Sequence, residues 1–265
     1  MKEQILAKLP PEYPWKEHFH YFDELDSTNT RIKAMAKAGA PHGTVLIADH
    51  QTGGHGRLGR SFHSPGGVGI YLSILLRPNC APMELMHLTC ATAVAMCNAV
   101  EAATGLLPGI KWTNDLVSGK RKLGGILTEL GLTPKGMVDY AIIGIGINCC
   151  QGERDFAPDI RHIAASLSMI TGKTIDRSSV AAAMMDTLHR MSVGLLTDKN
   201  AMLASYRENC ITLGKDISLV RGEEVRHGHA VDVNEEGALI VRFPDGHLEA
   251  VNSGEVSVRG MYGYL

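Results

Sequence analysis

The segment Val-Asp-Tyr-Ala-Ile-Ile-Gly-Ile-Gly-Ile, residues 138–147, is a β-branched run that predicts a central strand. Shorter apolar runs at 44–48 and 68–76 predict two further buried strands. Apolar residues at helical spacing predict helices over 27–37, 84–104, 180–195 and 200–209. Together these segments indicate an α/β body.

The pattern changes after about Gly214. Turn signals such as Asp245-Gly246 then separate five strand-like runs. These runs cover residues 217–220, 225–233, 238–243, 247–251 and 255–259. Short strands so closely spaced predict a small β-barrel attached to the α/β body. We therefore expect two domains, 1–213 and 214–265.

The composition is that of an ordinary globular protein. The chain has 265 residues, of which 45% are hydrophobic and 20% charged, and its formal net charge is -2. Such a charge gives no overall attraction to nucleic acid or to an anionic membrane. The N-terminus shows no apolar signal sequence, and polar residues interrupt the apolar stretch 85–100. We therefore expect neither a signal peptide nor a membrane span.

The cysteines and histidines form no known metal or disulfide pattern. None of the 6 cysteines belongs to a CxxC pair, so we expect reduced, mostly buried thiols, as in a cytosolic protein. The 12 histidines include no HExxH motif and no Cys/His cluster, which argues against a transition-metal site.

One glycine-rich segment carries cations but no acids. Residues 51–82 contain no Asp or Glu, yet they include Arg57, Arg60 and Arg77, and glycines are frequent over 53–69. This composition favours a loop whose backbone N–H groups and guanidinium groups close on an anion. The alternative is a surface loop in which the glycines only make turns.

Part of this segment, residues 54–59, matches the pattern GxGxxG. In a dinucleotide-binding fold this motif opens a helix, whereas here it runs on into Ser64-Pro65-Gly66-Gly67, which a helix does not tolerate. We therefore interpret the match as accidental.

A second charged cluster spans residues 111–129. It is predicted to form a hairpin with its turn at Ser118-Gly119, and it carries several cations and few acids. Lysine, asparagine and aspartate converging near a turn suit a site for a magnesium–nucleotide complex. A solvated basic hairpin explains the same residues.

Five segments of this chain resemble, in order, the motifs of biotin protein ligases. They are Asp-Ser-Thr-Asn at 26–29, Gln-Thr-Gly-Gly-His-Gly-Arg-Leu-Gly-Arg at 51–60, Lys-Trp-Thr-Asn-Asp at 111–115, Lys-Leu-Gly-Gly-Ile-Leu at 122–127 and Gly-Ile-Gly-Ile-Asn at 144–148. The resemblance extends from about Phe22 to the C-terminus. It implies an α+β fold, with a mixed-sheet catalytic domain of the biotin/lipoate ligase type and a C-terminal SH3-like β-barrel.

The resemblance also implies an activity. Such enzymes use ATP and Mg²⁺ to convert biotin to biotinyl-5′-AMP, and then transfer the biotinyl group to a lysine of a biotin carboxyl carrier protein. The first step brings together two anionic groups, so it requires cations rather than a protein nucleophile. We expect a cytoplasmic enzyme, monomeric or homodimeric, that binds neither DNA nor membrane.

Roles for individual residues follow from the same resemblance. The expected catalytic residues are Lys122, Arg57 and Arg60. The expected biotin-binding residues are Ser27, Thr28, Asn29, Gln51, Gly54, His55, Gly56, Arg57 and Lys122. The expected nucleotide-binding residues are Arg57, Arg60, Phe62, Lys111, Asn114, Lys122 and Asn148, and Asp115 is the expected metal ligand.

The chain departs from the family pattern at two positions. His55 stands where an arginine is usual, and Phe62 stands where some members carry a tryptophan. A histidine there preserves the backbone N–H and replaces the guanidinium group by an imidazole. Phe62 offers a smaller surface for stacking on adenine.

Three other functions remain open from the sequence. A lipoate or octanoate ligase or transferase has a related fold, although polar residues at 27–29 and 51 suit an apolar acyl chain poorly. A transcriptional repressor needs about sixty residues for a helix-turn-helix before the catalytic domain, and only about twenty precede Asp26. The third is a sensor that binds biotin without catalysis. The presence of the expected catalytic residues Lys122 and Arg57 argues against it.

Overall fold

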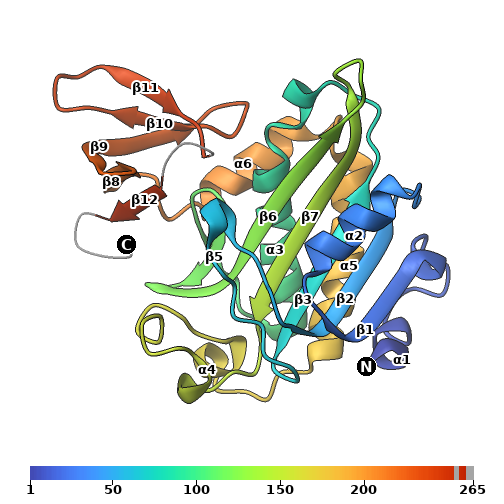
Figure 1. The fold of residues 1–265 in the computed structure, drawn as a ribbon. Coiled ribbons are helices and arrows are strands. Elements are labelled where there is room, and N and C mark those ends of the chain that lie inside the picture. Colours follow the sequence, from blue (N-terminus) through green and yellow to red (C-terminus); the bar gives the residue numbers. More distant parts are fainter. Residues whose placement is uncertain (254–256, 261–265) are drawn as a thin grey trace.

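The computed structural model describes residues 1–253 and 257–260 and has an α+β architecture (Figure 1). A seven-stranded mixed sheet has the strand order β1-β2-β3-β7-β6-β5-β4. Its strands are β1 (Phe19–Leu25), β2 (Thr44–Gln51), β3 (Gly69–Leu76), β4 (Gly109–Lys111), β5 (Asp115–Ser118), β6 (Arg121–Leu132) and β7 (Val138–Asn148). The strand predicted from residues 138–147 is thus confirmed, and it is the central one. Among the described strands of this sheet, only β1 and β2 pair in parallel.

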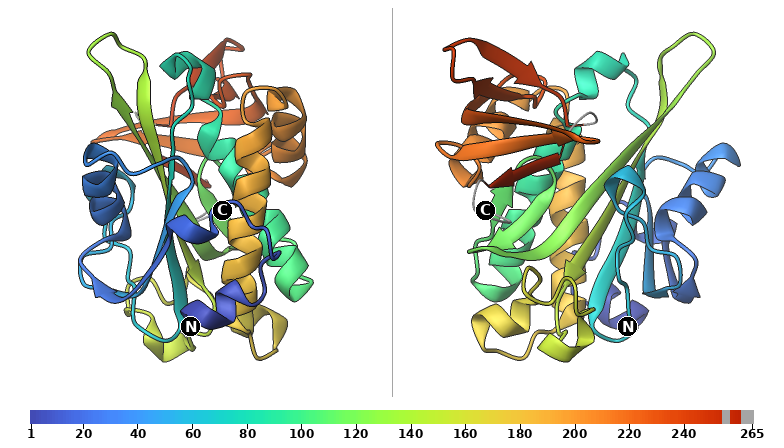
Figure 2. Two further views of the ribbon diagram at one scale, coloured as in Figure 1. Left: turned by 90° about the vertical axis from the view of Figure 1, so that its right-hand side faces the viewer. Right: turned by 60° about the vertical axis from the view of Figure 1, so that its left-hand side comes forward.

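Helices cover both faces of this sheet (Figure 2). The α-helices are α1 (Lys2–Leu6), α2 (Thr28–Lys37), α3 (Leu88–Thr104), α4 (Leu167–Thr171), α5 (Arg177–Gly194) and α6 (Lys199–Asn209). Short 3-10 turns are η1 (Lys16–His18), η2 (Arg57–Gly59), η3 (Pro82–Leu85) and η4 (Glu153–Asp155). Helices α3 and α5 bury one face of the sheet in the main apolar core, and α2 packs on the other face.

The helix predictions are confirmed apart from one boundary. Helix α2 has Ser27 as its N-cap, and the backbone N–H of Thr30 donates to the Ser27 hydroxyl oxygen at 3.4 Å. The helix predicted from residue 84 instead begins at Leu88, because Pro82–Leu85 forms a separate 3-10 turn. Strand β1 was not predicted from the sequence, since its polar residues mask the strand pattern.

By length and composition the segment Pro82–Thr104 is apolar enough to cross a membrane, but most of it is buried inside the fold. This burial is that of a core helix, because α3 packs between α5, α6 and the sheet. All 6 cysteines are free thiols, and all but Cys150 are buried, as expected.

The described residues after position 215 form a second, five-stranded antiparallel sheet with the order β11-β10-β9-β8-β12. Its strands are β8 (Asp216–Arg221), β9 (Glu224–Val233), β10 (Leu239–Arg242), β11 (Leu248–Val251) and β12 (Ser257–Gly260). All five strand-like runs expected in this region are therefore present, although residues 255 and 256 of the last run lie outside the described residues. This sheet packs beside α6 and the β4–β5 side of the main sheet (Figure 1).

Candidate functional site

Two adjoining cavities lie over the strands β5, β6 and β7. The first has a volume of about 150 Å³ and the second of about 830 Å³. Both are lined by Arg57, Arg60, Ser61, Phe62, Asn114, Asp115 and Lys122. The cations predicted from two distant segments of the sequence therefore converge at the junction of the two cavities.

The structure brings nearly all predicted site residues to these cavities. The first is lined by Ser27, Thr28, Asn29, Gln51, His55 and Gly56 in addition to the shared residues. The second adds Lys111 and Asn148 to the shared residues, so that it contains every residue predicted to bind the nucleotide. Gly54 is the exception: a Cβ there would lie 2.5 Å from the Phe62 carbonyl oxygen, so Gly54 shapes the loop from within.

Polar side chains form the floor of the first cavity. The backbone N–H and the hydroxyl of Thr28 donate to Gln51 Oε1, at 2.8 and 3.0 Å. Gln51 Nε2 donates to the hydroxyl oxygen of Ser64 at 2.9 Å. The Ser73 hydroxyl lies 2.8 Å from Thr28 Oγ1 and 2.6 Å from Asn29 Oδ1. Helix α2, strand β2 and strand β3 thereby fix one continuous hydrogen-bonded surface, which suits a ligand that both donates and accepts.

Glu129 belongs to this surface, although the sequence did not point to it. Asn29 Nδ2 donates to Glu129 Oε2 at 3.0 Å, and Lys33 Nζ lies 2.7 Å from Glu129 Oε1. These contacts fix which end of the Asn29 amide is the donor. Glu129 follows directly after the segment 122–127, and that proximity is the only sequence signal for it.

The glycines of β7 make room for the site. A Cβ on Gly144 would lie 2.0 Å from Asn29 Oδ1, and a Cβ on Gly146 would lie 2.4 Å from the Phe62 ring. Side chains, and not a neighbouring backbone, therefore occupy the space that these glycines leave open. The Phe62 ring also meets the Tyr71 ring edge-on, with centroids 6.4 Å apart.

The glycine-rich segment forms a folded-back loop over the first cavity. Isolated bridges join Gln51 to Ser64 and His55 to Ser61, and a single 3-10 turn closes the tip. Leu58 has a φ of 54°, a left-handed conformation that is uncommon for a bulky residue. The loop opens no α-helix, which confirms that its GxGxxG pattern is accidental.

Arg57 joins this loop to two other parts of the chain. Its Nη1 donates to Asn114 Oδ1 at 2.9 Å, and its Nη2 donates to the Ser253 carbonyl oxygen after β11. Asn114 Nδ2 in turn donates to the Ile126 carbonyl oxygen at 2.9 Å. Burial lowers the pKa of Arg57, and the charge of Asp115 opposes this effect. Arginine remains protonated in proteins, so the site keeps this positive charge.

Lys122 and Asp115 form an ion pair across the β5–β6 hairpin, with Nζ 2.6 Å from Oδ1. The side chains are 29% and 18% exposed, so the pair lies at the cavity wall. Asp115 is the one acid among the described residues that line the two cavities. The described residues contain no group of three or more His, Cys, Asp or Glu side chains able to hold a metal ion.

Two further parts of the chain also line the second cavity. Val220, Val225 and Val258 of the C-terminal sheet and Phe156 and Ile163 of the segment before α4 contribute apolar walls. Sequence reasoning missed these residues, because nothing local marks them as site residues.

Asn148 lies at the base of the second cavity. Its Nδ2 donates to the Ala165 carbonyl oxygen at 3.1 Å, and its Oδ1 accepts from Gln151 Nε2 at 3.3 Å. Both ends of this amide thus have partners within the protein.

Comparison with known proteins gives the family. Residues 21–148 match the biotin/lipoate A/B protein ligase family, and residues 212–259 match the biotin protein ligase C-terminal domain. The bifunctional ligase/repressor BirA of Bacillus spizizenii is 32% identical over 243 residues, which cover 91% of this chain and 74% of that protein. The chain belongs to the biotin protein ligase family.

Other biotin protein ligases are similar over comparable lengths. The biotin–[acetyl-CoA-carboxylase] ligase of Mycobacterium tuberculosis is 30% identical over 237 residues, which cover 87% of this chain and 85% of that protein. The structure of the Aquifex aeolicus biotin protein ligase in complex with biotin and ATP superposes with a TM-score of 0.77 at 31% identity. That superposition covers 91% of this chain and 98% of the other. The family resemblance and the fold inferred from the sequence are confirmed.

Proposed function

We propose that this protein is an ATP-dependent biotin protein ligase. In the first half-reaction the biotin carboxylate attacks the α-phosphate of ATP, forming biotinyl-5′-AMP and releasing pyrophosphate. In the second, a lysine amine of a biotin carboxyl carrier protein attacks the acyl carbon and AMP leaves. The observation that carries this proposal is the junction of a polar cavity with a larger one, lined by the cations Arg57, Arg60 and Lys122.

Each part of the site has a role in the first half-reaction. The surface formed by Thr28, Asn29 and Gln51 holds the ureido ring of biotin, because that ring both donates and accepts hydrogen bonds. Lys122 and Arg57 stabilise the negative charge that develops where carboxylate and phosphate meet. The loop over residues 53–64 excludes water, which would otherwise hydrolyse the mixed anhydride.

The nucleotide is assigned to the second cavity. Lys111, Asn114 and Asn148 line this cavity, and Phe62 stands between the two cavities with its ring on Gly146. A flat ring at that position offers a surface against which adenine can stack.

Asp115 is the proposed Mg²⁺ ligand. Mg²⁺ is typically held by one or two carboxylates together with substrate phosphates and water, and a single carboxylate at the junction of the cavities fits that pattern. When bound, the ion would screen the charge of the phosphates.

The test is ATP–pyrophosphate exchange with biotin, lipoate and octanoate offered in parallel. Exchange with biotin alone, followed by labelling of a carrier-domain lysine, is the expected result. Exchange with lipoate or octanoate instead would favour the related acyl ligases that share the matched family. Biotin binding without exchange would favour a non-catalytic sensor.

Three further assignments belong to this proposal. We place the protein in the cytoplasm, which suits its free thiols. We divide the chain into a catalytic domain, 1–213, and a C-terminal domain, 214–265, with support from the gap between α6 and β8. The acceptor is a biotin carboxyl carrier domain, and the expectations of a monomer or homodimer and of no DNA binding stay predictions.

A further inference from the structure

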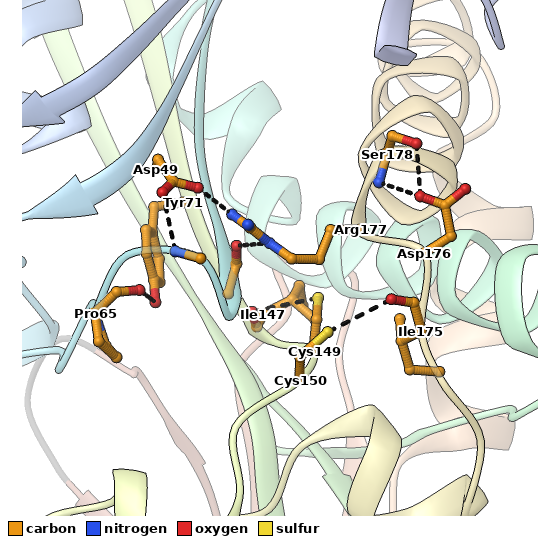
Figure 3. Close-up of polar contacts among 12 residues, drawn as sticks. Asp49, Pro65, Tyr71, Ile147, Cys149, Cys150, Ile175, Asp176, Arg177 and Ser178 are labelled. Carbon is orange, nitrogen blue, oxygen red and sulfur yellow. Dashed lines mark hydrogen bonds and ion pairs between the residues drawn. The ribbon is translucent and has the colours of Figure 1, made fainter. Parts of the chain in front are cut away.

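A polar cluster outside the two cavities joins α5, β2 and β3 to the C-terminal end of the glycine-rich loop. We call this end, residues 65–68, the far arm of the loop. Figure 3 shows Arg177, the first residue of α5, with its guanidinium group directed at the ends of β2 and β3. Arg177 Nη2 lies 2.5 Å from Asp49 Oδ1, and Arg177 Nε donates to the Gly69 carbonyl oxygen at 2.9 Å. The second oxygen of Asp49 accepts from the backbone N–H of Gly67 at 2.9 Å.

A second contact holds the same arm. The Tyr71 hydroxyl donates to the Pro65 carbonyl oxygen at 2.9 Å (Figure 3), and the Tyr71 ring meets the Phe62 ring. The residues from 65 to 68 are partly or fully exposed, and Gly66 and Gly67 leave this backbone unusually free. Apolar burial therefore does not hold the arm. Hydrogen bonds do, and they include those from the backbone N–H groups of Cys149 and Cys150 to the Val68 carbonyl oxygen, at 3.2 and 2.7 Å.

The position of Arg177 is itself fixed. Asp176 caps α5, where its carboxylate accepts from the Ser178 N–H at 2.9 Å and from the Ser178 hydroxyl at 2.6 Å. These bonds lower the pKa of Asp176, so the cap stays ionised over the whole physiological range. The side chains of Arg177 and Asp49 are only 15% and 27% exposed, which shields their ion pair from solvent.

We propose that Asp49 and Arg177 are positioning residues that anchor the far arm of the loop and thereby hold it closed over the first cavity. The other arm is anchored by backbone bonds, from Thr52 N–H to the Leu25 carbonyl and from Gly53 N–H to the Asp26 carbonyl. With both arms fixed, only the segment between residues 54 and 64 moves when ligand enters or leaves. This inference rests on the proposed function, because it assigns the anchor to the retention of biotin and of biotinyl-5′-AMP.

The test compares Asp49→Asn, Arg177→Met and Arg177→Lys with Arg77→Met. Arg77 is a matched control: it also pairs with an aspartate, Asp139 at 3.0 Å, and also donates to backbone carbonyl groups, but it lies at the opposite end of β3. Two readouts are used. The first is the rate of tryptic cleavage after Arg57 or Arg60 in the ligand-free protein, and the second is ATP–pyrophosphate exchange with biotin varied.

We expect Asp49→Asn and Arg177→Met to raise both the cleavage rate and the biotin KM on the order of tenfold, the effect of losing one charge-assisted hydrogen bond. The kcat should stay within about twofold, because neither residue touches the reacting atoms. Arg177→Lys keeps the ion pair but loses the bond to Gly69, so its values should be intermediate. Arg77→Met should match the unmodified protein in both readouts.

The inference is overturned if Asp49→Asn and Arg177→Met behave like Arg77→Met, or if kcat falls while cleavage and KM do not change. Should Arg177→Met fail to fold, Asp49→Asn and Arg177→Lys still give the comparison, because each removes one bond of the Asp49–Arg177 pair to the loop or to Gly69. If the unmodified protein shows no biotin-dependent exchange, the proposed function fails, and the cleavage comparison still decides the anchor.

Discussion

Replacing Lys122 by methionine tests the centre of the proposed mechanism. Methionine has a similar length and lacks the ammonium group, whose nitrogen lies 2.6 Å from Asp115 Oδ1. Removal of a single preorganised group that stabilises developing charge typically lowers kcat about 10²–10³-fold, or about 2.7–4 kcal/mol. We expect a loss of this size in the adenylation half-reaction, measured by ATP–pyrophosphate exchange. Biotin affinity, measured by calorimetry, should change by less than about fivefold, because the variant leaves intact the polar surface of Thr28, Asn29 and Gln51 that holds the ureido ring.

Unfolding of the Lys122→Met variant would not account for a loss of kcat of that size. An exposed ion pair contributes about 0–1 kcal/mol, and breaking a buried one costs about 3–5 kcal/mol. The pair Lys122–Asp115 is partly exposed at both ends. We therefore expect the free energy of unfolding to fall by about 1–2 kcal/mol, which leaves a typical domain folded.

A double-mutant cycle separates the two roles of Lys122. Asp115→Asn together with Lys122→Met removes the unpaired carboxylate and should restore stability but not the adenylation rate. Equal losses of biotin affinity and of exchange in Lys122→Met would refute the charge-stabilising role. Recovery of the rate in the double variant would refute it as well, and would show that Lys122 only neutralises Asp115.

Three further predictions concern residues that the tertiary structure singles out. Gly144→Ala places a methyl group 2.0 Å from Asn29 Oδ1, so calorimetry should show biotin affinity lowered at least about tenfold; unchanged affinity would contradict the geometry of the cavity floor. Glu129→Gln removes the charge that orients Asn29, and the biotin KM should rise about tenfold with kcat preserved, whereas a fall in kcat alone would argue against this role. Burial lowers the pKa of His87 below 6.5, so the folded chain binds fewer protons than the unfolded chain and stability falls as the pH drops below about 6.5. His87→Gln keeps a donor for the Leu195 carbonyl oxygen and should flatten this dependence in thermal unfolding between pH 5.5 and 7.5; an unchanged slope would exclude His87 as its source.

Local patterns predicted most of the fold. The helix predicted over residues 27–37 is α2, and the predicted turn at Ser118-Gly119 joins β5 to β6. The β-branched run at residues 138–147 became the central strand, because a strand buried on both faces needs apolar residues at nearly every position. The start of α3 was placed too early, since Pro82 favours a first helical turn and the sequence does not show that this turn stops after Leu85.

The predicted site residues illustrate what resemblance supplies and what it does not. Segments that are up to about 120 residues apart in the sequence line the same two cavities, and the roles that the family pattern implied for their residues stay predictions. Glu129, Ser73 and Phe156 were not predicted. Glu129 and Ser73 contact the Asn29 side chain, and Phe156 lines the second cavity. These contacts exist only in the folded chain.

The sequence by itself determined most of the elements, the family and the cationic character of the site, because these depend on residue type and local spacing. Only the tertiary structure decided that Asn29 contacts Glu129, that Arg57 reaches the carbonyl group of Ser253, and that Arg177 pairs with Asp49. The physical reason is that each of these contacts joins residues 100 or more positions apart. Such pairs are set by the packing of helices on the sheet, and no local pattern in the chain encodes them.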